Sequence, residues 1–187
     1  MPTTKSHRRV AVFGTLRIMT ISALLCAMSI VLGKYLAIRG GEVLRFSFEN
    51  LPILLSGMMF GPIVGVAVGV VADLVGCLLV GYAINPIVTL GAAMIGISSG
   101  LLYRLTAKLP LGARVSIATA TAHMLGSVLV KTLGLAAFYS MPLGVLMLWR
   151  LLNYVIVGVL EALLLTAVLK NRALTRLIRT ETERRPK

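Results

Sequence analysis

The chain has 187 residues, of which 58% are hydrophobic and 13% are charged, and its formal net charge is +13. The hydrophobic fraction exceeds the roughly 45–50% of soluble domains, and the apolar residues form runs of about 20, the length that crosses a bilayer. These continuous runs exclude a soluble protein and disfavour a β-barrel, whose strands would alternate. The basic residues cluster at 5–17, 104–114 and 170–187. Without interleaved aromatics, these clusters indicate cytoplasmic segments of a membrane protein rather than nucleic-acid binding.

The predicted fold is an all-α integral membrane protein with six transmembrane helices and both termini in the cytoplasm. Residues 1–14 are expected to be a basic cytoplasmic tail, residues 15–170 the six-helix domain, and residues 171–187 a second basic cytoplasmic tail. The first span, 15–36, is too long for the apolar part of a signal peptide and is therefore expected to be retained. It carries Ala23 and Ala27, a pair of small residues that allows close helix packing in lipid.

A long outer loop, residues 37–50, follows the first span. Gly40 and Gly41 indicate a turn, and residues 43–48 alternate like a short strand. A loop of this length on a compact domain is typically functional, and a lid over a binding site is the predicted role.

The second span, residues 51–60, is too short to cross straight, and it is expected to return to the cytoplasmic face at a turn formed by Gly61 and Pro62. The third span, 63–80, carries Asp73 at membrane depth, where a charge indicates a functional site. Three glycines four residues apart share the helix face that leads to Asp73, and this face is expected to serve close helix packing: Gly61, Gly65 and Gly69.

The remaining spans are predicted at 86–105, 115–139 and 145–169, joined by a basic loop at 103–114 and a turn at 140–144. The sequence contains no G-x-x-x-x-G-K-[ST] motif, so ATP hydrolysis by a P-loop is not expected. Uphill movement of a solute would therefore draw its energy from a partner or from an ion gradient.

Several cations depart from the positive-inside pattern and map to the outer half of the predicted domain: Lys34, Arg39, Arg45, Lys131 and Arg150. They outnumber the carboxylates there, Glu42, Glu49 and Asp73. Arginine suits carboxylate recognition, so the excess predicts a pocket for an anionic ligand. The alternative is that these cations snorkel, or that they pair with the nearby carboxylates and with lipid phosphate.

The predicted ligand contacts combine these charges with nearby polar and aromatic residues. Asp73 would accept hydrogen bonds from a heterocycle such as a pterin, or would form a salt bridge with Lys131 or Arg150. Aromatic rings at Phe46, Phe48 and Tyr82 would stack on a flat ligand or anchor the interface. Asn85 would cap the fourth span or face the ligand, and Asn153 lies three residues after Arg150, on the same helix face.

His123 and Glu161 are expected to lie deeper, either hydrogen-bonded to each other or the backbone, or forming a proton relay. Mutual or backbone hydrogen bonding is the preferred interpretation. No Ser-His-Asp order, H-E-x-x-H motif or pair of metal ligands stands out, so no catalytic residue, metal or cofactor is predicted, and the chain is not expected to be an enzyme. Cys26 and Cys77 are interpreted as small buried apolar residues.

The chain resembles the substrate-binding S components of energy-coupling factor (ECF) vitamin transporters, in particular the folate family. The resemblance covers nearly all of the chain after the basic tail and rests on six segments: 44–48 (LRFSF), 51–53 (LPI), 57–62 (GMMFGP), 72–76 (ADLVG), 85–90 (NPIVTL) and 130–135 (VKTLGL). It implies six helices in a prokaryotic plasma membrane, a vitamin bound at the outer face, and a lid formed by the loop after the first helix.

The same resemblance implies partners. Ala23 and Ala27 match the alanine motif that contacts the transmembrane T component, which works with two ATP-binding cassette ATPases. The S component is implied to topple in the surrounding lipid and release its vitamin inside. Folate is the expected vitamin, bound by Arg45, Phe46, Asp73, Tyr82, Asn85, Lys131, Arg150 and Asn153. Pantothenate, thiamine or a precursor is the alternative within this class, and a small membrane enzyme or relay using His123 and Glu161 is the alternative outside it.

Overall fold

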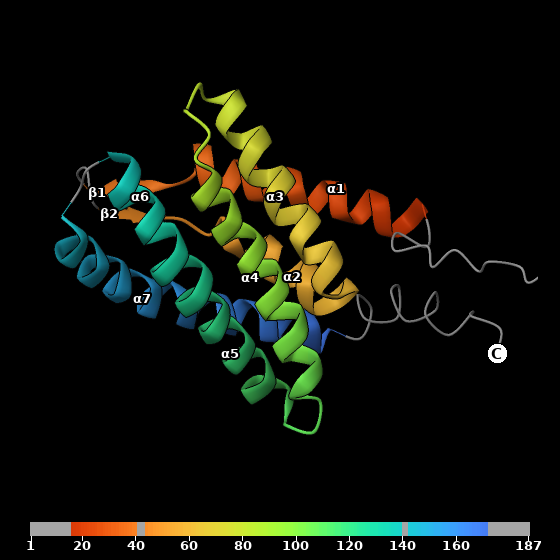
Figure 1. The fold of residues 1–187 in the computed structure, drawn as a ribbon. Coiled ribbons are helices and arrows are strands. Elements are labelled where there is room, and N and C mark those ends of the chain that lie inside the picture. The colour runs from red at the N-terminus through yellow and green to blue at the C-terminus, as the bar shows by residue number, and fades with distance from the viewer. Residues whose placement is uncertain (1–15, 41–43, 140–141, 172–187) are drawn as a thin grey trace, which may run out of the picture.

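The computed structural model describes residues 16–40, 44–139 and 142–171, and the two predicted tails lie almost entirely outside this part. Apart from one two-stranded hairpin, the regular elements of the described part are helices (Figure 1). In chain order they are α1 (Leu16–Ile30), η1 (Val31–Tyr35), β1 (Ile38–Gly40), β2 (Leu44–Phe46), α2 (Asn50–Phe60), α3 (Pro62–Leu79), α4 (Pro86–Leu105), α5 (Leu111–Ala122), η2 (His123–Val130), α6 (Lys131–Tyr139) and α7 (Leu143–Lys170). The segments η1 and η2 are π-helical: η1 continues α1, and η2 joins α5 to α6.

Five continuous helical segments are long and apolar enough to cross a membrane: Leu16–Tyr35, Pro62–Leu79, Pro86–Leu105, Leu111–Phe138 and Leu143–Lys170. They confirm five of the six predicted spans, with ends shifted by a few residues. The helix α2 is also apolar but has 11 residues, which rise about 16 Å, roughly half of a hydrocarbon core. This confirms the prediction that the second span is too short to cross straight.

The chain reverses between α2 and α3 at Gly61, whose φ of 105° lies in the region that favours glycine. Pro62 begins α3, where its missing N–H costs no hydrogen bond.

The hairpin pairs β1 and β2 antiparallel, with Arg39 opposite Arg45. The predicted turn at Gly41 and the residue Glu42 lie outside the described residues.

The glycine face of α3 packs inside the subunit, against α2 and α4. A Cβ atom built on Gly65 would lie 2.7 Å from the carbonyl oxygen of Gly96, and one built on Gly69 would lie 2.6 Å from that of Ala92. Helices approach this closely only where side chains are absent. This packing brings Asp73, one turn beyond Gly69, against α4.

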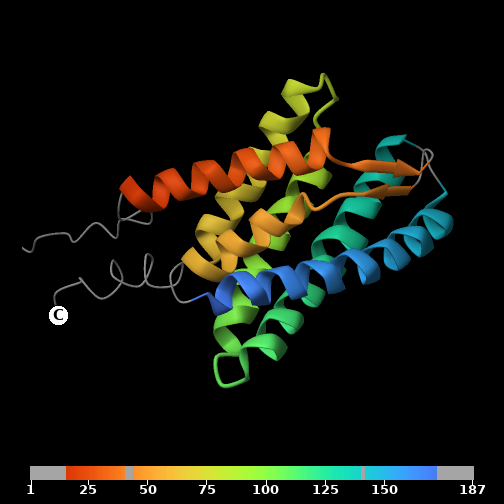
Figure 2. The ribbon, with the colours of Figure 1, turned by 180° about the vertical axis from the view of Figure 1, so that it is seen from behind.

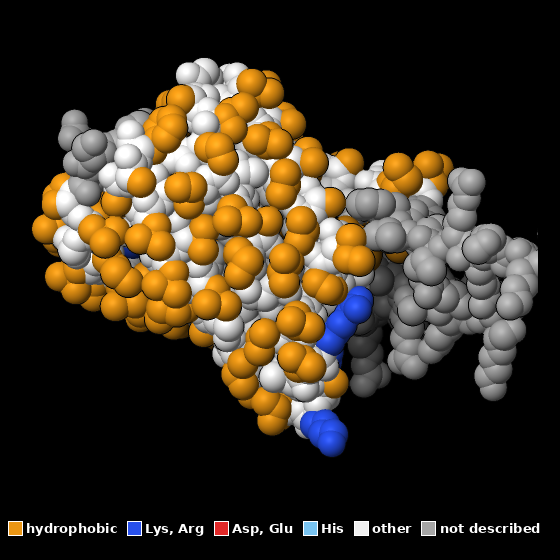
Figure 3. Space-filling view, viewed as in Figure 1, with side chains coloured by type: hydrophobic (Ala, Val, Ile, Leu, Met, Phe, Trp, Pro, Cys, Tyr) orange, Lys and Arg blue, Asp and Glu red, His pale blue; other side chains and the backbone are white. Residues whose placement is uncertain are grey.

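The apolar core forms among six helices of the bundle. The core joins α1, α2, α3, α4, α5 and α7, and six of its side chains have no exposed surface: Leu54, Ile95, Val115, Ala118, Ala122 and Leu165. The start of α1 and the end of α7 lie at one end of the molecule, and the hairpin lies at the opposite end (Figures 1 and 2). Hydrophobic side chains cover most of the face shown in Figure 3, and its blue Lys and Arg side chains lie mainly near the lower end of α4 and α5. This distribution is that of a helical bundle surrounded by lipid.

Candidate functional site

A buried ammonium group lies at the centre of the candidate site. Lys131, which is 5% exposed, begins α6. Its Nζ donates to Oε1 of Glu49 at 3.1 Å and to Oδ1 of Asn50 at 3.3 Å. A charge at this depth is tolerated only with such partners. The pair therefore ties the end of the loop that precedes α2 to α6.

The loop end is also held to α1. The Ser29 hydroxyl donates to the Glu49 carbonyl oxygen at 2.6 Å. A Cβ atom on Gly33 would come within 2.8 Å of the Glu49 side chain, so only glycine lets η1, the continuation of α1, approach this carboxylate so closely. Glu49 is thus positioned from both sides, by α1 and by α6.

Asp73 has a different partner from the two cations predicted for it. Its Oδ2 accepts a hydrogen bond from the Thr89 hydroxyl of α4 at 2.7 Å. The ion pair that the structure shows for Lys131 is with Glu49, and Arg150 binds a carbonyl oxygen. Asp73 nevertheless lines a small cavity of about 20 Å³ together with Lys34, Glu49 and Lys131. Two carboxylates and two ammonium groups therefore surround a space large enough for about one water molecule.

Arg150 is partly buried and faces η2. Its Nε and Nη2 donate to the Ser127 carbonyl oxygen at 3.3 and 3.1 Å, and Nη2 also donates to the Tyr154 hydroxyl at 3.4 Å. Asn153 is buried on the same helix, α7. The structure therefore links both cations to Ser127: Arg150 binds its carbonyl oxygen, and Lys131 reaches its hydroxyl through Asn50.

Asn85 caps the N-terminus of α4, which is one of the two roles predicted for it. Its Oδ1 accepts from the backbone N–H groups of Ile87 and Val88, and its Nδ2 donates to the Gly134 carbonyl oxygen at 2.9 Å. The side chain thus ties the start of α4 to α6. These contacts confirm the capping role, and they engage both polar atoms of the side chain.

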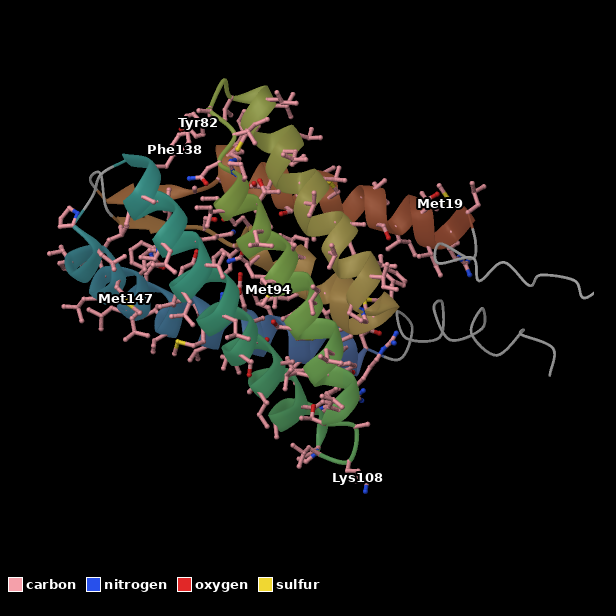
Figure 4. All side chains as sticks on the ribbon, viewed as in Figure 1. Met19, Tyr82, Met94, Lys108, Phe138 and Met147 are labelled. Atoms are coloured by element: carbon pink, nitrogen blue, oxygen red, sulfur yellow. The ribbon has the colours of Figure 1, made fainter. Side chains whose placement is uncertain are left out.

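The predicted aromatic and loop contacts lie toward the hairpin end. Tyr82 is 42% exposed, and the Lys34 Nζ lies 5.5 Å from its ring centroid. Tyr82 and Phe138 lie at the end of the molecule opposite Lys108 (Figure 4). Phe46 is partly buried on β2. Arg45 belongs to the same strand, but its side chain lies outside the described part of the structure.

His123 and Glu161 are hydrogen-bonded to each other, which confirms the preferred interpretation of this pair. The distance from His123 Nε2 to Glu161 Oε2 is 2.5 Å, and Glu161 has no exposed surface. The His123 ring stacks on Tyr154 with centroids 5.0 Å apart. Both rings line an apolar cavity of about 450 Å³ between the α5–η2 segment and α7. Within the described ranges, no group of three or more His, Cys, Asp or Glu residues could hold a metal ion.

Five further polar residues of this region were not among the predicted contacts: Glu49, Asn50, Thr89, Ser127 and Tyr154. Glu49 had been counted among the outer carboxylates, but nothing in the sequence pairs it with a residue 82 positions away. The sequence offered one signal for such contacts, the amide residue Asn50 at the start of an apolar helix, because a buried amide needs hydrogen-bond partners. Thr89 lies one turn after Asn85, but its contact with Asp73 depends on the packing of α3 against α4.

Comparisons with known proteins give the chain its family. The family model of the ECF transporter substrate-specific component matches residues 17–177. A solved structure described as the crystal structure of FolT bound with folic acid is 29% identical in sequence, with a TM-score of 0.68, over 84% of this chain and 95% of that chain. No curated protein matches the sequence. The match over most of the chain, together with the apolar helices and the buried polar site, shows that the chain belongs to the family of substrate-specific components of ECF transporters.

Proposed function

We propose that this chain is the folate-binding subunit of an ECF-type importer and captures the vitamin at the outer face of a prokaryotic plasma membrane. The similarity to FolT bound with folic acid carries the proposal, because it extends over 84% of this chain. Family membership assigns the chain to the binding component of a transporter, which is not a class of enzyme.

The chemistry of the candidate site supports a ligand with both a heterocycle and carboxylates. Asp73 and Glu49 offer acceptors to the N–H groups of a pterin ring. Arg150 offers a guanidinium charge that pairs well with a carboxylate, in addition to the hydrogen bonds by which its Nε and Nη2 hold the Ser127 carbonyl oxygen. We assign the remaining contacts to Arg45, Phe46, Tyr82, Lys131 and Asn153, while Asn85 orients the start of α4 beside them.

The basic clusters support the orientation of the chain. We assign the loop between α4 and α5, which carries Lys108, and both terminal tails to the cytoplasm. The hairpin end then faces outward, where the ligand arrives. Import itself would require a T component and two ATPases, since the sequence contains no P-loop motif of its own.

The decisive experiment combines identification of bound ligand with direct binding. The protein is purified from cells grown in rich medium, and small molecules released by denaturation are identified by mass spectrometry. Ligand-free protein is then titrated with folic acid, thiamine and pantothenate, with the fluorescence of Trp149, the single tryptophan, as the signal. Folate is expected to be released and to bind. Binding of thiamine or pantothenate alone would overturn the folate assignment, and failure to bind any vitamin would overturn the proposal.

A charge reversal locates the anion-binding part of the site. Arg150→Glu is expected to weaken folate binding at least tenfold, because a charge-assisted hydrogen bond is worth about 1.5–3 kcal/mol. The matched control is Lys108→Glu, the same change of charge on an exposed residue at the other end of the molecule. Equal affinities for the wild type and Arg150→Glu would remove Arg150 from the site.

A further inference from the structure

The buried pair His123–Glu161 has no part in the proposed binding chemistry, yet it is connected to it. The His123 Nδ1 lies 3.4 Å from the Ser127 hydroxyl, and the Asn50 Nδ2 donates to that same hydroxyl at 3.3 Å. Asn50 in turn accepts from Lys131 at 3.3 Å. An unbroken series of hydrogen bonds therefore links the Lys131 ammonium to the Glu161 carboxylate through Asn50, Ser127 and His123.

With the proton of His123 on Nε2, the donors in this series all point the same way. Asn50 Nδ2 can only donate, so the Ser127 oxygen accepts from it and the Ser127 proton is free to be donated to His123 Nδ1. A carboxylate only accepts, so His123 Nε2 carries the ring proton and donates it to Glu161 Oε2. A neutral imidazole protonated at Nε2 satisfies both contacts. The series thus runs from a cation to an anion without reversal, an arrangement in which each bond polarises the next.

A second set of contacts leads from His123 to Arg150. The ring stacks on Tyr154, whose hydroxyl accepts from Arg150 Nη2. The Ser127 carbonyl oxygen accepts from the same guanidinium. This carbonyl belongs to η2, where π-helical geometry alters the regular backbone pairing, a feature frequent at functional sites. His123 therefore supports both cations of the candidate site.

We propose that His123 and Glu161 are positioning residues of the binding site. Glu161 fixes the proton of His123 on Nε2, His123 fixes the direction of the Ser127 hydroxyl, and Ser127 fixes the Asn50 amide so that its oxygen faces Lys131. The pair thereby determines where the ammonium of Lys131 lies, from the opposite end of a buried series of side chains. This inference rests on the proposed function for its effect on binding, but not for the proton arrangement it assigns.

The test compares two substitutions of Glu161 that differ in one property. Glu161→Gln keeps an oxygen that accepts from His123, whereas Glu161→Leu keeps similar bulk without an acceptor. Glu161→Leu is expected to weaken folate binding about tenfold, as for loss of one well-aligned polar contact, and Glu161→Gln is expected to remain within about threefold of the wild type. In a Lys131→Met background, Glu161→Leu should no longer change the affinity, because coupled residues give non-additive effects. Thr119→Val, a buried substitution one turn from His123 and outside the series, is the control and should leave binding unchanged.

Two outcomes would overturn the inference. Additive losses in Glu161→Leu and Lys131→Met would show that Glu161 acts independently of Lys131. A ¹⁵N NMR spectrum of His123 showing the proton on Nδ1, or on both nitrogens, would contradict the assigned series. The NMR measurement needs no ligand, so it tests this inference even if the wild type fails to bind folate, which would overturn only the proposed function.

Discussion

At the scale of single residues, Lys131 illustrates how a membrane span accommodates a charge. Its ammonium has a carboxylate and an amide oxygen within 3.3 Å, and both come from the junction of the preceding loop with α2. The ion pair closes the bundle between two segments that are distant in sequence. The ion pair therefore contributes first to the stability of the fold. Any contact that Lys131 makes with a ligand then involves a side chain that this pair already holds in place.

Removal of the cation should accordingly destabilise the fold. Lys131→Met is expected to lower the free energy of unfolding by about 2 kcal/mol, less than the 3–5 kcal/mol for a fully buried pair, because the Glu49 side chain keeps 24% of its surface exposed. The double variant Lys131→Met/Glu49→Gln should recover part of this loss, since it removes both charges. Thermal unfolding in detergent measures the loss in the single variant and the recovery in the double variant. Lys170→Met, at the exposed end of α7, is the control. A double variant less stable than Lys131→Met would contradict this account.

At the scale of secondary-structure elements, the spans and the turn at Gly61 could be predicted because the information is local. Runs of apolar residues determine which segments lie in lipid, and the glycine spacing determines which face of α3 approaches its neighbours. The π-helical geometry of η2 could not be predicted, because it depends on packing between α4 and α7. The pairing of Asp73 with Thr89 escaped prediction for the same reason, since the charge of Asp73 does not specify which helix it will face.

The contact between α3 and α4 gives a prediction about packing. A Cβ atom on Gly96 would lie 2.2 Å from the backbone carbon of Gly65, so Gly96→Ala must separate the two helices. We expect a loss of about 1–3 kcal/mol in the free energy of unfolding, as for overpacking. Gly112→Ala in α5 is the matched control, because its Cβ would have no atom within 4 Å. Its stability should be unchanged or slightly higher, since alanine favours helices. Equal thermal midpoints for the two variants would contradict the close packing.

At the scale of the whole molecule, the outer surface of α1 is left open by the fold. The helix buries Ser22, Leu25, Cys26 and Ser29, whereas Ala23 and Ala27 are exposed on its other side. Two small exposed residues four apart leave a shallow strip where a second helix can approach closely. In lipid, such a strip favours a protein partner, and we assign it to the T component.

Filling this strip should separate transport from binding. Ala23→Trp/Ala27→Trp is expected to leave the folate affinity of the isolated subunit unchanged, because the strip faces away from Lys131 and its partners. The same change should abolish copurification with the T component and ATPases and reduce folate uptake at least tenfold, since close packing of small residues supplies most of such a helix contact. Ile156→Trp, on an exposed position of α7, adds the same bulk to a lipid-facing surface and should preserve both activities. Normal uptake by the double tryptophan variant would exclude this face of α1 from the interface. Loss of folate binding would instead mean that α1 transmits changes to the site, through the contact of Ser29 with the loop end at Glu49.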